Sequence, residues 1–383
     1  MKKLPATIWA LGAVSLLMDL SSELVHSLLP IFMTGVLGAS MLAVGVVEGI
    51  AEATASIVKL FSGALSDRLG RRKPLVVLGY GLAALAKPLF PLAGSVALVA
   101  AARFMDRIGK GIRGAPRDAL IADVTPESVR GAAYGLRQAL DTVGGVLGPL
   151  AAIGLMFLLV SDVRSVLWWA VVPAIAAVAV LVLFVKEPEG AVRPLARFSF
   201  ESFNQLGGRT WAIVALGGIL TLARFSEAFL VLRAQDLGVA LALVPIVLVV
   251  MNITYTATAY PAGVAADRGY RNVLLVSGLL ALILSDVLIA STSSLGAFFS
   301  AVLLWGLHMG LTQGLLSTLV AEAAPEKLRG TAFGVFHLVS GIALLAASLI
   351  AGALWETFGA AWTFYAGAAL TAVALAGLLL LKK

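Results

Sequence analysis

The sequence contains no cysteine among its 383 residues, which excludes disulfide bonds and thiolate metal sites. Charged residues make up only 13% of the chain, about half of the roughly 25% found in soluble domains. Hydrophobic residues make up 60%. This composition excludes a disordered chain, a coiled coil and a nucleic-acid-binding domain, and it predicts an integral membrane protein.

Enzyme motifs are also absent. The chain has no GxSxG, HExxH or Walker A sequence, and the glycine-rich run RIGKGIRG lacks the spacing of a phosphate-binding loop. We therefore expect no enzyme activity, no cofactor and no ATP site. With no ATP site, any movement of a solute across a membrane would be driven by a gradient, and the many carboxylates inside apolar runs make a proton the simplest coupling ion.

Apolar runs separated by glycine, proline and charge predict an all-α membrane protein with twelve transmembrane helices. We expect these helices near residues 6–36, 41–65, 74–94, 96–122, 128–159, 164–185, 209–235, 239–265, 272–291, 295–322, 327–353 and 358–381. Most lysines and arginines outside the helices fall on one side, and the opposite loops hold only Arg164 and Arg233. The positive-inside rule then predicts that both termini are cytoplasmic.

The chain repeats itself. GALSDRLGR begins at Gly63 and GVAADRGYR at Gly263, while IADVTPESVRGAAYG at 121–135 pairs with VAEAAPEKLRGTAFG at 320–334. We therefore predict two pseudo-symmetric six-helix bundles, residues 1–185 and 209–383, joined by a cytoplasmic linker at 186–208. Such repeats enclose a central pathway at their interface.

These strings carry a family resemblance. GALSDRLGRRKPL resembles the loop 2–3 signature of the major facilitator superfamily, and RFMDRIGKG at 103–111 is similar to that family's element in helix four. Gly135, Gly144 and Gly148-Pro149 are similar to the helix-five signature of its drug-efflux antiporter branches, although Ala152 and Ile153 stand where that signature ends in glycines. MDLSSELVHSLLP resembles a prokaryotic branch of the superfamily. The resemblance implies alternating access around a cavity lined by helices one, four, seven and ten.

Ionisable residues at membrane depth are costly and face partners or cavities. Asp19 and Glu23 share one face of the first helix, as four-residue spacing requires, and Asp19 aligns with Arg224 in the repeat. Our candidates for the proton-coupling residue are Asp19, Glu23, Glu48, Asp106 and Glu227.

A cationic stripe on the fourth helix contains Arg103, Arg107 and Lys110 at spacings of four and three. If acids pair with all three, a neutral or cationic ligand fits; if one is unpaired, it attracts an anion, and Arg107 is our choice. The full set of substrate-binding candidates is His26, Arg103, Arg107, Lys110, Arg137, Asp141, Arg224, Asn252, Tyr255, His308, Gln313 and His337.

Charges at the cytoplasmic loops suggest a gate. We expect them to hold the two halves together when the outside is open, through short-range charge pairs. The gating candidates are Asp67, Arg68, Arg71, Arg130, Asp267 and Arg268.

The sequence thus predicts a monomeric proton-coupled secondary transporter of the prokaryotic cytoplasmic (inner) membrane, with a small molecule, protons and lipid as its partners. Export of a small amphiphilic or charged organic compound is the first hypothesis, favoured by the glycine signature of the fifth helix. Proton-coupled uptake of an anionic solute or siderophore-like chelate is the alternative, favoured by the cationic stripe. A divalent-metal exporter is less favoured, because the three histidines lack metal-binding spacing, and we assign no metal site.

Overall fold

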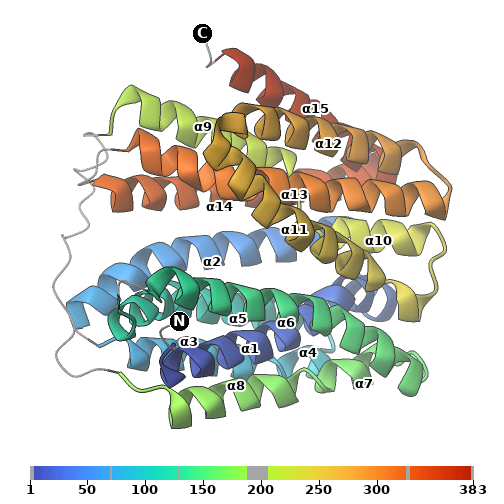
Figure 1. Ribbon diagram of the computed structural model, residues 1–383. Helices are drawn as coiled ribbons and strands as arrows, with labels where there is room; N and C mark the ends of the chain where they lie inside the picture. Colours follow the sequence, from blue (N-terminus) through green and yellow to red (C-terminus); the bar gives the residue numbers. More distant parts are fainter. Residues whose placement is uncertain (1–3, 70, 127–128, 188–205, 325–327, 381–383) are drawn as a thin grey trace. The chain divides into compact units, whose positions relative to one another are not determined.

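The computed structural model describes residues 4–69, 71–126, 129–187, 206–324 and 328–380, and every regular element in those ranges is helical (Figure 1). The prediction of an all-α chain is therefore confirmed for this part. Ten helical segments are long and apolar enough to cross a membrane, and one of them, Leu241–Ser291, covers two helices. The helix Val96–Val124 falls outside this group because it carries too many charged side chains.

Residues 1–37 and 54–197 form the first compact unit. Three of the predicted helices are interrupted, and two of these interruptions lie in this unit. One is at Pro88, since proline removes a backbone donor, and the other follows Trp168. Its elements are α1 (Ala6–Ile31) with η1 (Phe32–Val36), the C-terminal part of α2 (Met41–Leu69), α3 (Lys73–Ala86), α4 (Leu89–Leu92), α5 (Val96–Val124), α6 (Arg130–Leu158), α7 (Val163–Trp168) and α8 (Val171–Phe184).

Residues 38–53 and 198–383 form the second unit. The third interruption lies here, between α9 and α10, where Arg224 leaves helical geometry with φ −113° and ψ 85°. Its elements are the N-terminal part of α2, α9 (Gly208–Ala223), α10 (Ala228–Asp236), η4 (Leu241–Leu243), α11 (Ile246–Ala265), η5 (Ala266–Tyr270), α12 (Arg271–Ser291), α13 (Leu295–Ala323), α14 (Arg329–Phe358) and α15 (Ala360–Leu380).

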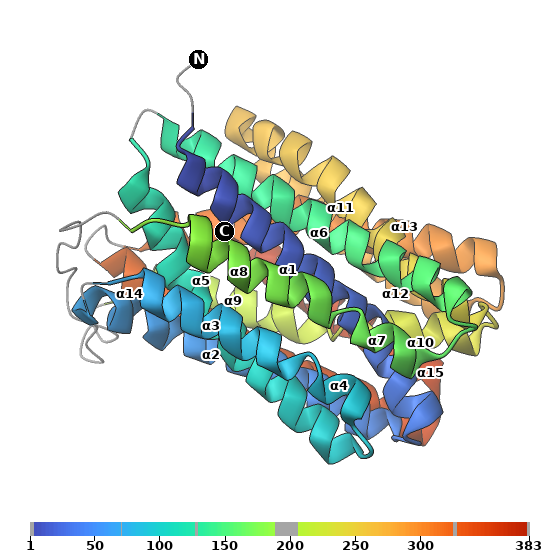
Figure 2. The same ribbon diagram turned by 90° about the horizontal axis from the view of Figure 1, so that it is seen from below.

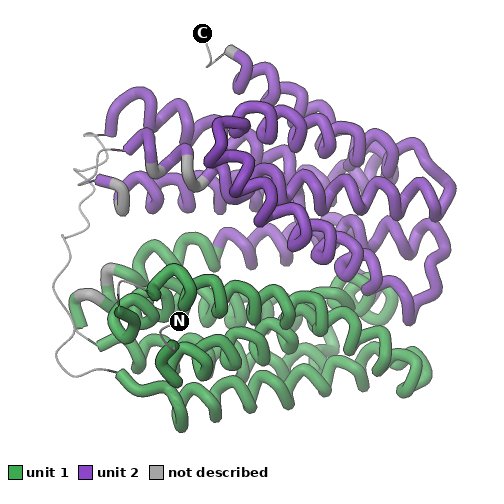
Figure 3. The backbone as a smooth tube through the Cα atoms, in the orientation of Figure 1, with its two compact units in different colours: residues 1–37, 54–197 green, residues 38–53, 198–383 purple. Residues whose placement is uncertain are grey.

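Helix α2 belongs to both units, and its colour changes along its length in Figure 3. Its N-terminal part packs closely on α14. A Cβ atom on Gly45 would lie 2.2 Å from the Ser348 carbonyl oxygen, and one on Gly352 would lie 2.6 Å from that of Met41. Only glycine permits such an approach of two helix backbones. The two contact-defined units thus differ from a simple division of the chain at the predicted linker, 186–208, most of which lies outside the described residues.

Within the first unit, α1 lies against both α6 and α8, as Figures 1 and 2 show. Helix α3 packs on α5 as closely as α2 packs on α14. A Cβ on Gly79 would lie 2.6 Å from the Gly109 carbonyl oxygen and 2.7 Å from the Arg113 Cβ. The second unit repeats this contact. A Cβ on Gly278 would meet the Thr312 side chain at 2.6 Å and the His308 carbonyl oxygen at 3.6 Å. The three positions are each shifted by 199 residues, so α3–α5 and α12–α13 are equivalent pairs.

This close approach generates the first prediction. Gly79→Ala should lower the free energy of unfolding by about 1–3 kcal/mol, because the added methyl group meets backbone atoms that cannot move separately. Gly81→Ala is the matched control on the same helix, since a Cβ there meets nothing within 4 Å. The thermal unfolding midpoints of the two purified variants measure the effect. Equal midpoints would contradict the packing described here.

Candidate functional site

The charged stripe of α5 is largely neutralised inside the first unit. The buried Lys87 ammonium on α3 donates to Asp106 Oδ1 at 2.8 Å and to the Ser22 hydroxyl on α1 at 3.0 Å. The buried Arg107 lies 3.9 Å from the other oxygen of Asp106. We call Lys87 and Asp106 the α3–α5 ion pair. Asp106, a candidate for proton coupling, is therefore a carboxylate held by two cations.

Arg103, the next member of the stripe, is buried and lies beside a histidine. Its Nη2 atom lies 2.7 Å from Nδ1 of His26 on α1. Because a guanidinium group only donates hydrogen bonds, His26 accepts with an unprotonated Nδ1. The two substrate-binding candidates thus form one contact between α1 and α5.

The third member of the stripe differs. Lys110 is exposed, and within the described part of the chain its ammonium has neither a hydrogen bond nor an ion pair. It lies close enough to Asp19 and Asp141 to act on both electrostatically. The exposed cation of the stripe is consequently Lys110 rather than our sequence choice Arg107, which is buried beside Asp106.

Two acids meet where α1 crosses α6. The side chains of Asp19 and Asp141 lie within hydrogen-bonding reach of each other, and we call them the α1–α6 acid pair. Both are partly buried. Glycines bring the helices together here: a Cβ on Gly144 would lie 2.5 Å from the Leu16 carbonyl oxygen and 3.1 Å from the Asp19 Cβ. Gly144, which belongs to the glycine pattern of the fifth predicted helix, therefore lets the two carboxyl groups approach each other.

Two arginines lie close to one member of the acid pair, Asp141. Arg137 lies 3.4 Å from the Asp141 carboxylate, one helical turn away, and Arg117 lies 4.0 Å from it. Arg117 also contacts Asp118 at 3.2 Å, while Arg113 stacks over the Tyr80 ring at 4.6 Å from its centroid. Lys110 and Arg113 act electrostatically on Asp19, whereas the two arginines in ion-pair contact with the acid pair, Arg117 and Arg137, lie against Asp141.

The remaining acidic candidates occupy different surroundings. Glu23 is partly buried on α1, and a Cβ on Gly148 would lie 2.8 Å from its own Cβ. Glu48 on α2 is buried, and Glu227 lies at the start of α10, beside Arg224. Neither Glu48 nor Glu227 is without partners.

In the second unit, Arg224 has Glu227, Tyr255 and Glu52 as charged or polar neighbours. His308, another candidate, lies close enough for Arg224 to act on it electrostatically. His308 is buried and its Nδ1 bonds to the Gly278 carbonyl oxygen at 2.9 Å. His337 stacks on Phe333, whereas Asn252 and Gln313 are only partly buried. Among the described residues no group of three His, Asp or Glu side chains is arranged to hold a metal ion.

The ends of the helices that the sequence places at the cytoplasmic side carry a repeated ion pair that the gating candidates do not include. In the first unit Arg72 Nε donates to Asp123 at 2.6 Å, and in the second Arg271 donates to both oxygens of Glu322 at 2.5 and 2.8 Å. The two pairs are 199 residues apart at both positions. Arg72, rather than Arg71, is therefore the counterpart of Arg271, because the first copy of the motif holds one more residue. The Arg271 hydrogen bond lowers the pKa of the Glu322 carboxyl.

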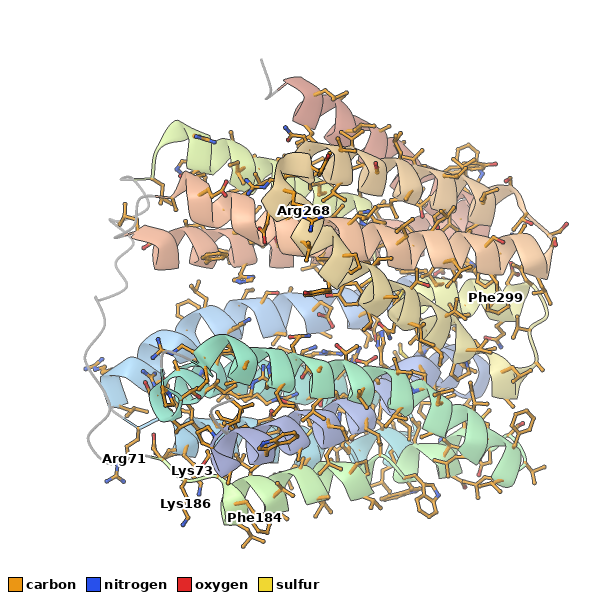
Figure 4. The ribbon with its side chains drawn as sticks, viewed as in Figure 1. Arg71, Lys73, Phe184, Lys186, Arg268 and Phe299 are labelled. Atoms are coloured by element: carbon orange, nitrogen blue, oxygen red, sulfur yellow. The ribbon has the colours of Figure 1, made fainter. Side chains whose placement is uncertain are left out.

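The gating candidates themselves are mostly exposed. Arg68, Arg71, Asp267 and Arg268 are exposed, and Arg130 donates to the Ala122 carbonyl oxygen at 3.4 Å. The Asp67 side chain lies outside the description. Figure 4 labels Arg71 near Lys73 and Lys186 at one end of the first unit, and Lys73 Nζ bonds to the Val182 carbonyl oxygen at 3.1 Å.

Two functional positions escaped the sequence analysis, Lys87 and Arg72. Each had a signal. Lys87, like Lys59, is a lysine inside an apolar run, and a buried lysine predicts a buried acid. Arg72 lies within the loop motif, but three consecutive basic residues gave no reason to choose one of them.

The α3–α5 ion pair generates the second prediction. Lys87→Met or Asp106→Asn alone should cost about 3–5 kcal/mol of unfolding free energy, because each leaves one buried charge uncompensated. The double variant Lys87→Met/Asp106→Leu should recover most of that loss. As a control, Asp236→Asn removes the exposed ion pair with Arg233 and should cost less than about 1 kcal/mol. A double variant as unstable as the sum of the singles would disprove this account.

Comparisons with known proteins agree with this architecture. The profile of the Major Facilitator Superfamily matches residues 11–232 and 215–383. An uncharacterized MFS-type transporter of Methanocaldococcus jannaschii is 32% identical, over 99% of this chain and 95% of its own length. Multidrug resistance protein MdtH of Yersinia pestis is 26% identical, over 92% and 85%. The crystal structure of the nucleoside transporter NupG (D323A mutant) aligns with a TM-score of 0.83 at 13% identity, over 98% of this chain and 100% of that one.

Proposed function

The chain belongs to the major facilitator superfamily of membrane transporters, and we propose that within it the protein is a proton-coupled antiporter that exports a small amphiphilic or charged organic compound. The observation that carries this proposal is the α1–α6 acid pair. It combines two carboxyl groups at membrane depth with two arginines in ion-pair contact with Asp141. The protein is not an enzyme.

A hydrogen bond between two carboxyl groups requires a proton, because ionised carboxylates can only accept. Two like charges at such a distance also repel strongly, as in other carboxylate dyads. Arg117 and Arg137 lie against Asp141 and stabilise its negative charge. The shared proton therefore resides on Asp19, which makes Asp19 the proton carrier of this proposal.

The same pair accounts for exchange. Removing the proton leaves two adjacent negative charges in a partly exposed site, and a cationic substrate group replaces the proton there. Proton and substrate then compete for one site, which is the requirement of antiport. Export as the direction of transport is supported by the glycine pattern that includes Gly144 and by MdtH, a relative named as a multidrug resistance protein.

The proposal includes a membrane setting. The lysines and arginines of the predicted inner loops favour cytoplasmic termini, and bacterial and archaeal relatives favour a prokaryotic inner membrane. We propose a monomer as the transporting unit. The exposed Arg68, Arg71 and Arg268, with Arg130, Asp67 and Asp267, are proposed to act at the cytoplasmic gate, and the pairs of Arg72 and Arg271 are proposed to brace it.

A third prediction tests the coupling. In inside-out membrane vesicles with an acidified lumen, cationic amphiphiles should release acridine orange quenching when the wild-type protein is present. Asp19→Asn should abolish this release, because Asn carries no exchangeable proton. Asp141→Asn should reduce it at least about tenfold, since the shared proton loses its acceptor. Asp236→Asn is the control with an acid removed outside the pair. Wild-type release in both Asp19→Asn and Asp141→Asn would reject the coupling role.

One observation favours the second candidate, uptake of an anionic solute. Lys110 is an exposed cation near the acid pair, and its ammonium could hold a carboxylate or phosphate group. An anion bound at Lys110 would be stabilised when Asp19 is protonated, which is the requirement of proton-coupled symport.

The fourth prediction separates the candidates. If anions bind, Lys110→Gln should weaken their affinity about 10- to 100-fold, the size of a charge-assisted hydrogen bond. Arg107→Gln, whose side chain is buried beside Asp106, serves as the comparison. Thermal stabilisation of the purified variants by matched anionic, neutral and cationic ligands measures this. Preference for cations, unaffected by Lys110→Gln, would exclude the anion candidate; loss of anion binding only in Arg107→Gln would assign the role to Arg107.

A further inference from the structure

A carboxylic acid lies buried in the second unit with no polar partner. Asp286 on α12 is 0% exposed, and neither of its carboxyl oxygens has a hydrogen bond to any described residue. Burying an ionised carboxylate without a partner costs far more than burying the neutral acid. This single side chain was not among our sequence candidates, because an isolated Asp in an apolar run gives no spacing to interpret.

The surroundings of Asp286 are aromatic and backbone groups. A Cβ on Gly367 of α15 would lie 2.6 Å from Asp286 Oδ2, 3.0 Å from a Phe225 ring carbon and 3.4 Å from the Ala223 carbonyl oxygen. Phe225 packs in turn on Trp305 and Phe364, each with ring centroids 5.4 Å away. The acid thus lies where α12, α15 and the end of α9 meet.

The end of α9 is the interruption of the seventh predicted span. Helix α9 stops at Ala223 and α10 begins at Ala228. No backbone N–H or side chain of the described residues donates to the carbonyl groups of Leu222 and Ala223. Such unpaired carbonyls at a broken membrane helix need a donor. A protonated carboxyl group can supply one, whereas a carboxylate cannot.

The internal repeat shows what this position requires. Shifted by 199 residues, the α3–α5 ion pair of Lys87 and Asp106 becomes Asp286 and Trp305. The equivalence rests on the matching contacts of Gly79 and Gly278. In the first unit the buried charge is neutralised by a partner of opposite sign. In the second unit the partner position holds an indole, whose Nε1 is also buried without a hydrogen bond. The only remaining way to neutralise Asp286 is a proton.

No ionisable group among the described residues forms a hydrogen bond with Asp286. Facing elements provide Arg224 and Glu227 at the interruption, His308 on α13 and Tyr365 on α15. The acidic neighbours of Arg224 are Glu227 and Glu52, His308 bonds to Gly278, and Tyr365 is exposed. On α12 itself, Arg271 bonds to Glu322 at the cytoplasmic end.

We propose that Asp286 is a second proton-binding site of this protein, occupied in the arrangement described here and coupled to the geometry of the α9–α10 interruption. The neutral acid packs among the aromatic rings and can donate to the carbonyl groups at the end of α9. A rearrangement of α9 and α10 that admits water would release the proton. This site is independent of the α1–α6 acid pair and of the direction of transport.

Infrared spectroscopy of the purified protein tests occupancy directly. At neutral pH the wild type should show a carboxylic-acid C=O stretching band, above the amide I region, that is missing from Asp286→Asn and shifts on exchange into D₂O. The band should persist in Asp19→Asn, so that failure of the coupling proposal and failure of this one are distinguishable. Identical spectra of wild type and Asp286→Asn would overturn the proposal.

Stability against pH provides the second readout. A group that binds a proton in the folded state and loses it in the unfolded state makes the protein less stable as pH rises. Between about pH 5 and pH 8 the wild-type midpoint should therefore fall by several degrees more than that of Asp286→Asn. Asp286→Glu, which keeps the acid, should retain the steeper dependence if it folds. A wild-type midpoint that is raised by Na⁺ but has the variant's pH dependence would indicate a cation site and reject the proton.

Discussion

The constraint on which this structure depends is the cost of charge in a bilayer interior. The chain carries an unusual number of ionisable side chains at membrane depth, and the described part neutralises them in three ways. Lys87 and Asp106 form an ion pair, Arg103 lies against Nδ1 of His26, and in our proposal the two acids at the crossing of α1 and α6 share a proton. The first two arrangements fix helix packing, since removing a partner exposes a buried charge. In our proposal only the third arrangement changes its charge during a transport cycle.

Glycine makes these arrangements possible. Ion pairs and shared protons act over a few ångströms, and helices separated by ordinary side chains would hold the groups too far apart. Gly144 lets α1 approach α6, and Gly79 and Gly109 let α3 approach α5. The efflux-type glycine signature is thus more than a packing motif in this chain. Gly144 sets the distance between the two carboxyl groups, and the proposed sharing of a proton depends on that distance.

The sequence predicted the helices well because each is a long apolar run with clear ends, and periodicity reports which residues share a helix face. It identified Asp19 and Asp141 but assigned them to different roles, since their meeting depends on the crossing of α1 and α6. The sequence did not identify Asp286 as a candidate, because its surroundings also depend on how separate helices pack. The choice between Arg107 and Lys110 also required tertiary information: both lie on one stripe, but Asp106 turns toward Arg107, and no spacing rule predicts that direction. The gating, coupling and substrate roles stay predictions.

The two halves of the repeat carry similar charged groups near the helix ends and different ones at membrane depth. Both keep an arginine–acid pair near the ends of the membrane-spanning helices, Arg72 with Asp123 and Arg271 with Glu322, because charged groups there are near water and cost little. Deeper in the membrane the halves diverge, and a buried ion pair in one unit corresponds to a lone acid beside an indole in the other. An ion pair is neutral at any working pH, whereas a lone acid is neutral only when protonated. In our proposal, an acid at the position of the lysine turns a fixed structural contact into a position whose stability depends on protons, and the interruption between α9 and α10 lies beside it.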